Sequence, residues 1–219
     1  MRAMLTNQLR TLRPSLLSQR VDGHHPARVD VESFIAHVYR ERYGARLTSF
    51  LPHLLAFRNG GGELQAATGL RYASEGPLFV EQYLDRPAEE AISTRIGRGV
   101  QRHELVEVGN FASLSAGDAR DIIVRMTELL HGEGVRWVLF VATRQLRNAF
   151  NKLHLGTQVL AAAEPERLRD RSDDWGRYYD SNPHVLWGDI AAGYAHLHPD
   201  APVHEQRNSM GAKMCGCAS

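Results

Sequence analysis

The stretch ELVEVGNFASLSAGDARDIIVRMTELLHGEGVRWVLFVAT, residues 104–143, decides the fold. It reads as an apolar strand around 105–108, a Ser/Gly loop, an amphipathic helix, and a second apolar strand over 135–141. The second strand lacks alternation, which is typical of a strand buried on both faces of a parallel sheet. We therefore predict a right-handed strand–helix–strand unit. The helix is indicated by apolar residues at three-four spacing, namely Ala119, Ile122, Ile123, Met126, Leu129 and Leu130.

The loop of this unit, from Ser113 to Gly117, should bring free backbone N–H groups and a helix N-terminus to one point. Ser115 is a candidate N-cap, and Asp118 three residues later suits a capping box. Such a point attracts anions, phosphate especially. An ordinary strand-to-helix turn uses the same residue types for backbone reasons, so both interpretations stay open.

Composition excludes several classes of protein. With 219 residues, 43% of them hydrophobic, the chain is long enough to build a core. A formal charge of +1 gives no nucleic-acid footprint. Both cysteines, Cys215 and Cys217, lie in the last five residues, so we expect no disulfide framework and a cytoplasmic protein. No apolar run is long enough to span a membrane, and the N-terminus lacks the apolar core of a secretory signal.

We expect three parts in the chain. Residues 1–28 should form a flexible basic leader. A weak surface-binding helix is the less favoured alternative, because Pro14 interrupts the leucines at helical spacing. Residues 29–195 should form the folded domain, including an aromatic C-terminal helical arm. Residues 196–219 lack periodicity and should be a flexible tail. Because the clustered His and Cys residues lie in this tail, we predict no metal site.

The elements outside the central unit predict a mixed α/β sheet, antiparallel in its first half and parallel at its centre, flanked by helices. Alternation from Leu78 to Leu84 indicates a strand in which Phe79, Glu81 and Tyr83 share one face, as suits either the wall of a pocket or a solvent-facing sheet surface. The other expected elements are a helix over 29–47, a hairpin of 51–59 and 63–73 turning at 60–62, helices over 87–97 and 144–156, and a strand over 156–163.

The segment after residue 164 is polar with embedded aromatic side chains. Rigid amphipathic rings in such a segment either close over a ligand or dock a partner, and a plain helical arm packed on the sheet is an equal alternative. The rings that we consider substrate-binding candidates are Trp175, Tyr178 and Tyr179.

This order of elements resembles the GNAT acyltransferase architecture, in which a strand, an anion-binding loop and a helix hold the pyrophosphate of an acyl carrier. The loop keeps the family's Gly and terminal Ala at Gly117 and Ala119, with Leu114 where Arg or Gln belongs. Phe150 stands where the superfamily often carries a Tyr general acid, so that hydroxyl is absent. The acyl-homoserine-lactone synthase branch is also similar, with Asn110 in place of its Arg three residues after Glu.

The chain from Val31 to Gly193 is most similar to the thermostable haemolysin family. That resemblance implies acyl transfer, with an acyl-CoA or acyl-carrier-protein thioester as cosubstrate and no tightly bound cofactor. Its motifs here are GPLFVEQYL at 76–84, VEVGNFA at 106–112, RNAF at 147–150 and WGRYY at 175–179.

Glu107 is the candidate catalytic base. It lies between two valines in a strand that should be covered, and a buried carboxylate needs a partner or a purpose. Desolvation raises a carboxyl pKa, which tunes it as a base for an amine. The alternative is an ion pair with Arg71, Arg144 or Arg147. Asn110, near the end of the same strand, is placed to orient a carbonyl or stabilise developing negative charge.

Candidate phosphate ligands are Arg120 on the loop helix and Arg144 and Arg147 on the helix after the second strand. Ordinary solvation on the surface is the alternative for each of them. Ser113 and Ser115 have no recognisable His partner, so a covalent acyl-serine route is disfavoured.

Three functional hypotheses follow. The first is an N-acyltransferase acting on a small amine or amino-acid-like acceptor, with the Ser113–Arg120 loop binding the carrier, and Glu81 and Tyr83 lining the site. The second is a membrane-active haemolysin, as the family name suggests. The third is an acyl-binding module without catalysis, motivated by Leu114 and Phe150.

Overall fold

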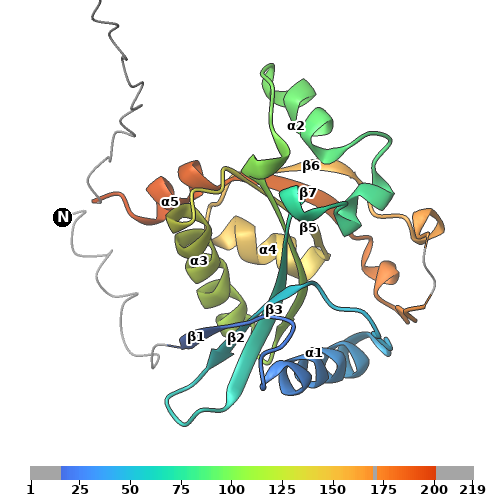
Figure 1. The fold of residues 1–219 in the computed structure, drawn as a ribbon, viewed down its shortest axis with the longest axis vertical. Helices are drawn as coiled ribbons and strands as arrows, with labels where there is room; N and C mark the ends of the chain where they lie inside the picture. Colours follow the sequence, from blue (N-terminus) through green and yellow to red (C-terminus); the bar gives the residue numbers. More distant parts are fainter. Residues whose placement is uncertain (1–15, 170–171, 201–219) are drawn as a thin grey trace, which may run out of the picture.

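The computed structural model describes residues 16–169 and 172–200 (Figure 1). Our expectations for residues 1–15 and for the tail from residue 201 lie outside the described residues. None of the helices in the described ranges is long and apolar enough to cross a membrane.

A seven-stranded mixed sheet forms the centre of the molecule, in the order β1-β2-β3-β4-β5-β7-β6. The β4–β5 pair is parallel and every other neighbouring pair is antiparallel, which confirms the predicted fold class and its parallel central pair. The strands are β1 (Leu17–Val21), β2 (His53–Arg58), β3 (Leu64–Tyr72), β4 (Leu105–Ser113), β5 (Trp137–Ala142), β6 (Thr157–Ala162) and β7 (His184–Asp189).

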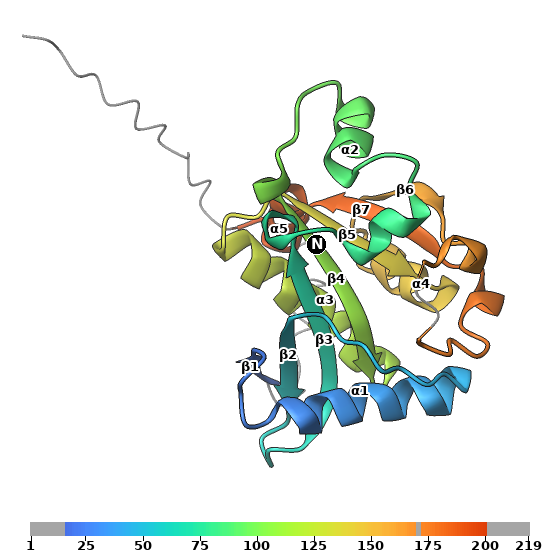
Figure 2. The same cartoon turned by 45° about the vertical axis from the view of Figure 1, so that its right-hand side comes forward.

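Helices cover both faces of this sheet (Figures 1 and 2). Alternation along β2 separates the faces, because Leu54 and Ala56 pack with α1 while Leu55 and Phe57 pack with α3. We call these the α1 face and the α3 face. The helices are α1 (Arg28–Tyr43), α2 (Ala88–Ile96), α3 (Ala116–Gly132), α4 (Arg144–Lys152) and α5 (Ile190–Leu197).

The start of α3 is capped as the sequence predicts. The Ser115 hydroxyl accepts from the Asp118 N–H at 3.1 Å, and the Asp118 carboxylate accepts from the Ser115 N–H at 3.1 Å. This reciprocal pair satisfies two of the amides that a helix N-terminus leaves open.

The strand predicted over 78–84 is wrong, because Phe79–Tyr83 forms a 3₁₀ helix, η3. Carboxylate side chains accept hydrogen bonds from the backbone N–H groups that a strand would have paired with a neighbouring strand. Glu81 accepts from the Leu78 N–H at 2.8 Å, and Glu107 accepts from the N–H groups of Phe79 and Val80. Phe79, Glu81 and Tyr83 therefore do not share one face.

Two strands were missing from the sequence prediction. β1 lies within the stretch predicted as a flexible leader, and it pairs with β2 from Leu17↔Arg58 to Val21↔Leu54. β7 lies within the predicted helical arm, where Val185, Leu186 and Trp187 are buried between β5 and β6. The ordered domain thus begins before residue 29, and the arm is a strand followed by α5.

The β4 strand is distorted in its middle and then leaves β5. Its register against β3 shifts between Ala67 and Gly69, and Asn110 takes a left-handed backbone with φ 49°. Pairing with β5 extends only from Leu105↔Trp137 to Val108↔Phe140, although β4 continues to Ser113. A gap therefore opens between the two parallel strands, and Figure 2 shows β4 running on toward α1.

Residues 172–182, which we call the aromatic segment, form hydrogen bonds with the residues that follow α1. Arg46 and Asp174 exchange backbone hydrogen bonds of 2.6 and 3.1 Å. The Asp173 carboxylate accepts from the hydroxyl groups of Thr48 and Ser49 at 2.8 and 2.7 Å. At Gly176, φ is 51° and a Cβ would overlap the carbonyl oxygen of Tyr43, so only glycine permits this approach.

We expect Gly176→Ala to destabilise the protein by about 3 kcal/mol, because it combines left-handed backbone strain with a backbone clash. Gly97→Ala is the matched control, since Gly97 is also left-handed but has open space around its Cβ position, and we expect a cost of about 1 kcal/mol there. Urea denaturation of both variants measures the difference. Equal costs would contradict the close contact of the aromatic segment with α1.

Candidate active site

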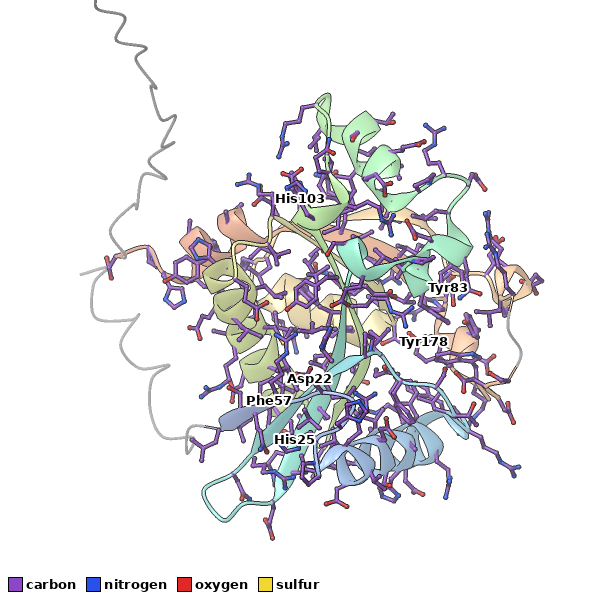
Figure 3. All side chains as sticks on the ribbon, in the orientation of Figure 1. Asp22, His25, Phe57, Tyr83, His103 and Tyr178 are labelled. Carbon is purple, nitrogen blue, oxygen red and sulfur yellow. The ribbon has the colours of Figure 1, made fainter. Side chains whose placement is uncertain are left out.

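A cavity of about 300 Å³ lies at the gap between β4 and β5 and has walls on both faces of the sheet. The α1-face wall is polar and aromatic, whereas the α3-face wall is apolar. Tyr83 and Tyr178, both labelled in Figure 3, come from η3 and the aromatic segment and line the same cavity. The main α1-face side chains are Tyr39, Arg71, Phe79, Tyr83, Glu107, Trp175, Tyr178 and Tyr179. The main α3-face side chains are Ile123, Met126, Leu130, Val138, Phe140, Leu146, Phe150, Leu155 and Ile190.

Glu107 lines this cavity with a side chain that is almost completely buried, its residue exposure being 2%. Its Oε2 accepts from the Phe79 N–H at 2.6 Å and its Oε1 accepts from the Val80 N–H at 3.1 Å. The carboxyl partners are thus the open amides at the start of η3, rather than the guanidinium groups that the sequence offered as an alternative.

Burial raises the pKa of Glu107 to about 7, and the Phe79 and Val80 amides together with the charge of Arg71 limit that increase. A carboxyl group that titrates near neutral pH exchanges protons readily with an amine. The geometry and the pKa direction both fit the predicted role of general base.

Tyr83 and Tyr179 join η3 to the aromatic segment beside Glu107. Their hydroxyl oxygens lie 2.5 Å apart, and either one can be the donor. Burial raises the pKa of Tyr83, and burial raises the pKa of Tyr179 to about 12, so both stay protonated near neutral pH. Since two hydroxyl groups share one hydrogen bond, the second proton is available to a ligand.

The side chain of Asn110 organises the cavity wall. Its Oδ1 accepts from the Leu51 N–H at 2.9 Å, which ties the loop before β2 to the distorted part of β4. The left-handed conformation of Asn110 and this bond together keep Leu51 against Gly69 and Gly109, where a Cβ would lie within 3 Å of Leu51. The role that the structure shows is positioning, and the NH₂ group is not used by this bond.

Glu81, a predicted site residue, is not among the side chains that line the cavity. It forms an ion pair with Arg102 at 2.7 Å and accepts from the Ala88 N–H at 3.0 Å. Although burial acts to raise it, the pKa of Glu81 is held below its usual value by Arg102 and by the Ala88 and Leu78 amides. Its function in this structure is to hold η3 and the start of α2.

A second cavity of about 340 Å³ adjoins the first and shares the walls Tyr39, Phe111, Val141, Leu146 and Tyr178 with it. Cations from three helices line it, Arg42 from α1, Arg120 from α3 and Lys152 from α4. Ser113 lines it too, and its carbonyl accepts from Arg42 at 2.9 Å. Cations of three helices around one cavity favour an anionic ligand.

The remaining predicted carrier-binding residues lie outside both linings. Ser115 uses its hydroxyl for the α3 cap, and Gly117 follows in the first turn. Arg144 is exposed, while Arg147 points its Nη1 toward the His184 Nδ1 at 3.4 Å. Of the predicted carrier-binding residues, only Ser113 and Arg120 line the second cavity, and their role in carrier binding stays a prediction.

Sequence reasoning missed Arg42 and Lys152, and it considered Arg71 only as an ion-pair partner. No pattern along the chain marks Arg42, because α1 meets the α3 loop only through tertiary packing. Among the described residues, no group of three or more His, Cys, Asp and Glu side chains is arranged to hold a metal ion.

The fold is GNAT-like: it has a mixed sheet, a parallel β4–β5 pair that stops pairing after Val108, and two adjacent cavities that share walls. The sequence profile described as "Thermostable hemolysin" matches residues 21–194, so the chain belongs to that family. No curated protein matches the chain.

Three solved structures share this fold at low identity. The AHL synthase LasI gives a TM-score of 0.58 at 11% identity, covering 89% of this chain and 100% of LasI. FeeM, an N-acyl amino acid synthase from uncultured soil microbes, gives a TM-score of 0.56 at 13% identity, covering 83% of this chain and 94% of FeeM. The CoA-dependent acyl-homoserine lactone synthase BjaI, with SAM and isopentyl-CoA, gives a TM-score of 0.55 at 13% identity, covering 84% of this chain and 88% of BjaI.

The raised pKa of Glu107 predicts a specific pH dependence of stability. Between its ordinary value of 4.5 and about 7, the native state keeps a proton that the unfolded chain releases, so stability falls as pH rises and is constant above that window. Relative to Glu107→Gln, the wild type should lose about 3 kcal/mol across this range. Urea denaturation of both proteins from pH 4.5 to 7.5 measures this loss. A pH-independent difference would show that the Glu107 pKa is ordinary.

Proposed function

We propose that this protein is an N-acyltransferase that moves an acyl group from a thioester carrier to the nitrogen of an amine. The observation that supports this most directly is Glu107, a buried carboxylate with a pKa near 7 that lines the first cavity. The solved relatives by fold are acyl-transferring synthases by name, which agrees with this choice.

The carrier would enter through the second cavity. Arg42, Arg120 and Lys152 there suit the phosphates of acyl-CoA or of a carrier protein's phosphopantetheine. Beyond Val108 the β4 backbone no longer pairs with β5, so an amide-bearing arm could pair with this edge of β4 in the gap. Two of its carbonyl groups are already used, since that of Gly109 accepts from Thr68 and that of Ser113 from Arg42. In this proposal the thioester carbonyl would lie between the two faces of the sheet.

The acceptor would approach from the α1 face. Its nitrogen attacks the thioester carbonyl while Glu107 takes the nitrogen proton, directly or through water. The tetrahedral intermediate then collapses, the carbon–sulfur bond breaks, and the carrier leaves as a thiol after gaining a proton, which balances the proton that Glu107 took from the nitrogen. Phe150 offers no hydroxyl for that last proton, whereas the Tyr83–Tyr179 pair keeps one hydroxyl proton available to ligands on the α1 face.

Acceptor-dependent release of free thiol tests the proposal. We expect turnover with members of a panel of acyl-CoA and acyl-carrier-protein thioesters when amines and amino acids are supplied. Glu107→Gln should lower kcat by about 100-fold or more, because general-base catalysis contributes that much. In the wild type kcat/KM should rise with pH through about 7, following the deprotonation of Glu107.

Glu104→Gln is the matched control, since Glu104 directly precedes the same strand and pairs with Arg98 at 3.5 Å outside the cavity. It should retain wild-type turnover. Absence of thiol release across the panel, together with erythrocyte lysis by purified protein and by Glu107→Gln alike, would refute the enzyme and support a membrane-active haemolysin.

The apolar wall on the α3 face would hold the acyl chain. Gly193 of α5 lies in this wall, where a Cβ would meet Leu155 and Thr127 at 3.5 Å, an ordinary contact distance. The glycine thus leaves room that a larger side chain would fill.

We expect Gly193→Leu to shift the preferred acyl chain to a shorter length, lowering kcat/KM for the longest accepted chain by about 10-fold or more, because the leucine side chain would occupy space that the chain otherwise fills. Ala195→Leu on the exposed side of α5 is the control and should leave the preference unchanged. Competition among acyl-CoA thioesters of different length measures the shift. An unchanged profile in Gly193→Leu would place the acyl chain elsewhere.

A further inference from the structure

Arg71 of β3 is the direct cross-strand neighbour of Glu107. The two Cα atoms are partners in the β3–β4 register, so both side chains extend from the α1 face of the sheet. Arg71 lines the same cavity as Glu107, and its Nη1 donates to the Pro77 carbonyl at 3.1 Å. A guanidinium has five N–H donors, so most of the fork is not used by that bond.

The charges around the cavity single out this pair. Among the described residues that line it, Arg71 is the only Lys or Arg. Of the other lining carboxylates, Asp173 accepts from Thr48 and Ser49, and Asp189 pairs with Arg136 at 2.5 Å. A cation beside a carboxylate base is therefore the charge pattern that this cavity presents to a ligand.

We propose that Arg71 binds the carboxylate of an α-amino acid acceptor while the amino group of that acceptor faces Glu107. The inference rests on the proposed function for the position of the amine. In an α-amino acid the amine and the carboxylate are separated by one carbon. Glu107 and Arg71 start from directly opposed strand positions about 5 Å apart, so their side chains can reach two groups that lie this close together. Guanidinium binds carboxylate through two parallel hydrogen bonds, which a neutral amide or a simple amine cannot reproduce.

This role makes Arg71 a determinant of acceptor class. An acceptor without the carboxylate would leave the Arg71 fork partly unpaired inside a cavity, and a site built to form a hydrogen bond discriminates strongly against analogues that lack the partner. The predicted substrates are free amino acids, and the products are N-acyl amino acids that carry a negative charge.

Product binding tests the inference without requiring turnover. Isothermal titration would compare N-octanoyl derivatives of leucine, phenylalanine and serine with the corresponding carboxamides. The wild type should bind the carboxylates about 10-fold more tightly or better, and Arg71→Gln should abolish this preference, because a charge-assisted bidentate pair is lost. Binding of the carboxamides should stay unchanged in Arg71→Gln, which also shows that the cavity remains folded.

Arg58→Gln is the matched control. Arg58 ends β2 and also donates to a single backbone carbonyl, that of Gly62 at 2.9 Å, but it does not line the cavity. Its preference should equal that of the wild type. Arg71→Lys should keep part of the preference, since it retains the charge without the fork.

Two outcomes would overturn the inference: equal binding of carboxylates and carboxamides by the wild type, or an unchanged preference in Arg71→Gln. The thiol-release assay separates this from the proposed function. Turnover with simple amines as efficient as with amino acids would refute the carboxylate site and leave the acyltransferase intact. Arg71-dependent binding without any thiol release would refute the acyltransferase and leave the carboxylate site.

Discussion

The hydrogen bonds from η3 to the Glu107 carboxylate are the interaction on which the site depends. A buried carboxylate is tolerated only when other dipoles replace water, and here the N–H groups of Phe79 and Val80 do so at 2.6 and 3.1 Å. The same two bonds turn the chain into a 3₁₀ helix, and that turn directs Tyr83 to its partner Tyr179. The pKa of Glu107, the path of the backbone and the aromatic wall therefore have a common physical origin.

A second constraint opens the sheet. Asn110 holds a left-handed backbone, and the loop residue Leu51 lies so close to Gly69 and Gly109 that neither position accepts a side chain without movement. In the same part of the sheet the β3–β4 register shifts, and the pairing of β4 with β5 ends at Val108. Since unpaired backbone inside a protein needs partners, the gap is a favourable place for a ligand that carries amides. The close contact of Leu51 with Gly69 and Gly109 thus lies at the cavity wall.

Much of the centre was predictable from sequence, because its signals are local. The three-four spacing and the Ser115–Asp118 cap define α3, and an unalternating apolar run defines β5. Glu107 was recognisable as a carboxylate in a covered strand. The strand predicted at 78–84 failed because its alternation was overridden by a local hydrogen bond from the Leu78 N–H to Glu81 and by tertiary hydrogen bonds to Glu107. The β7 strand was hidden by the polar stretch around it, and Arg42 reaches the second cavity only through folding.

Glu81 and Glu107 show how one short turn creates two different carboxylates. Both carboxylates accept hydrogen bonds from backbone N–H groups of residues 78–80. Arg102 contacts Glu81 at 2.7 Å, and the pKa of Glu81 is lowered. Among the described residues Glu107 has no such contact, and burial raises its pKa. A guanidinium bound to Glu107 would remove its basicity, since an opposite charge nearby stabilises the carboxylate. Arg71 is opposite Glu107 in the sheet, but it donates to Pro77 instead. That bond keeps a cation close enough to act on a ligand while leaving Glu107 with a pKa near 7, which is the condition that the proposed amine acceptor with a carboxylate would require.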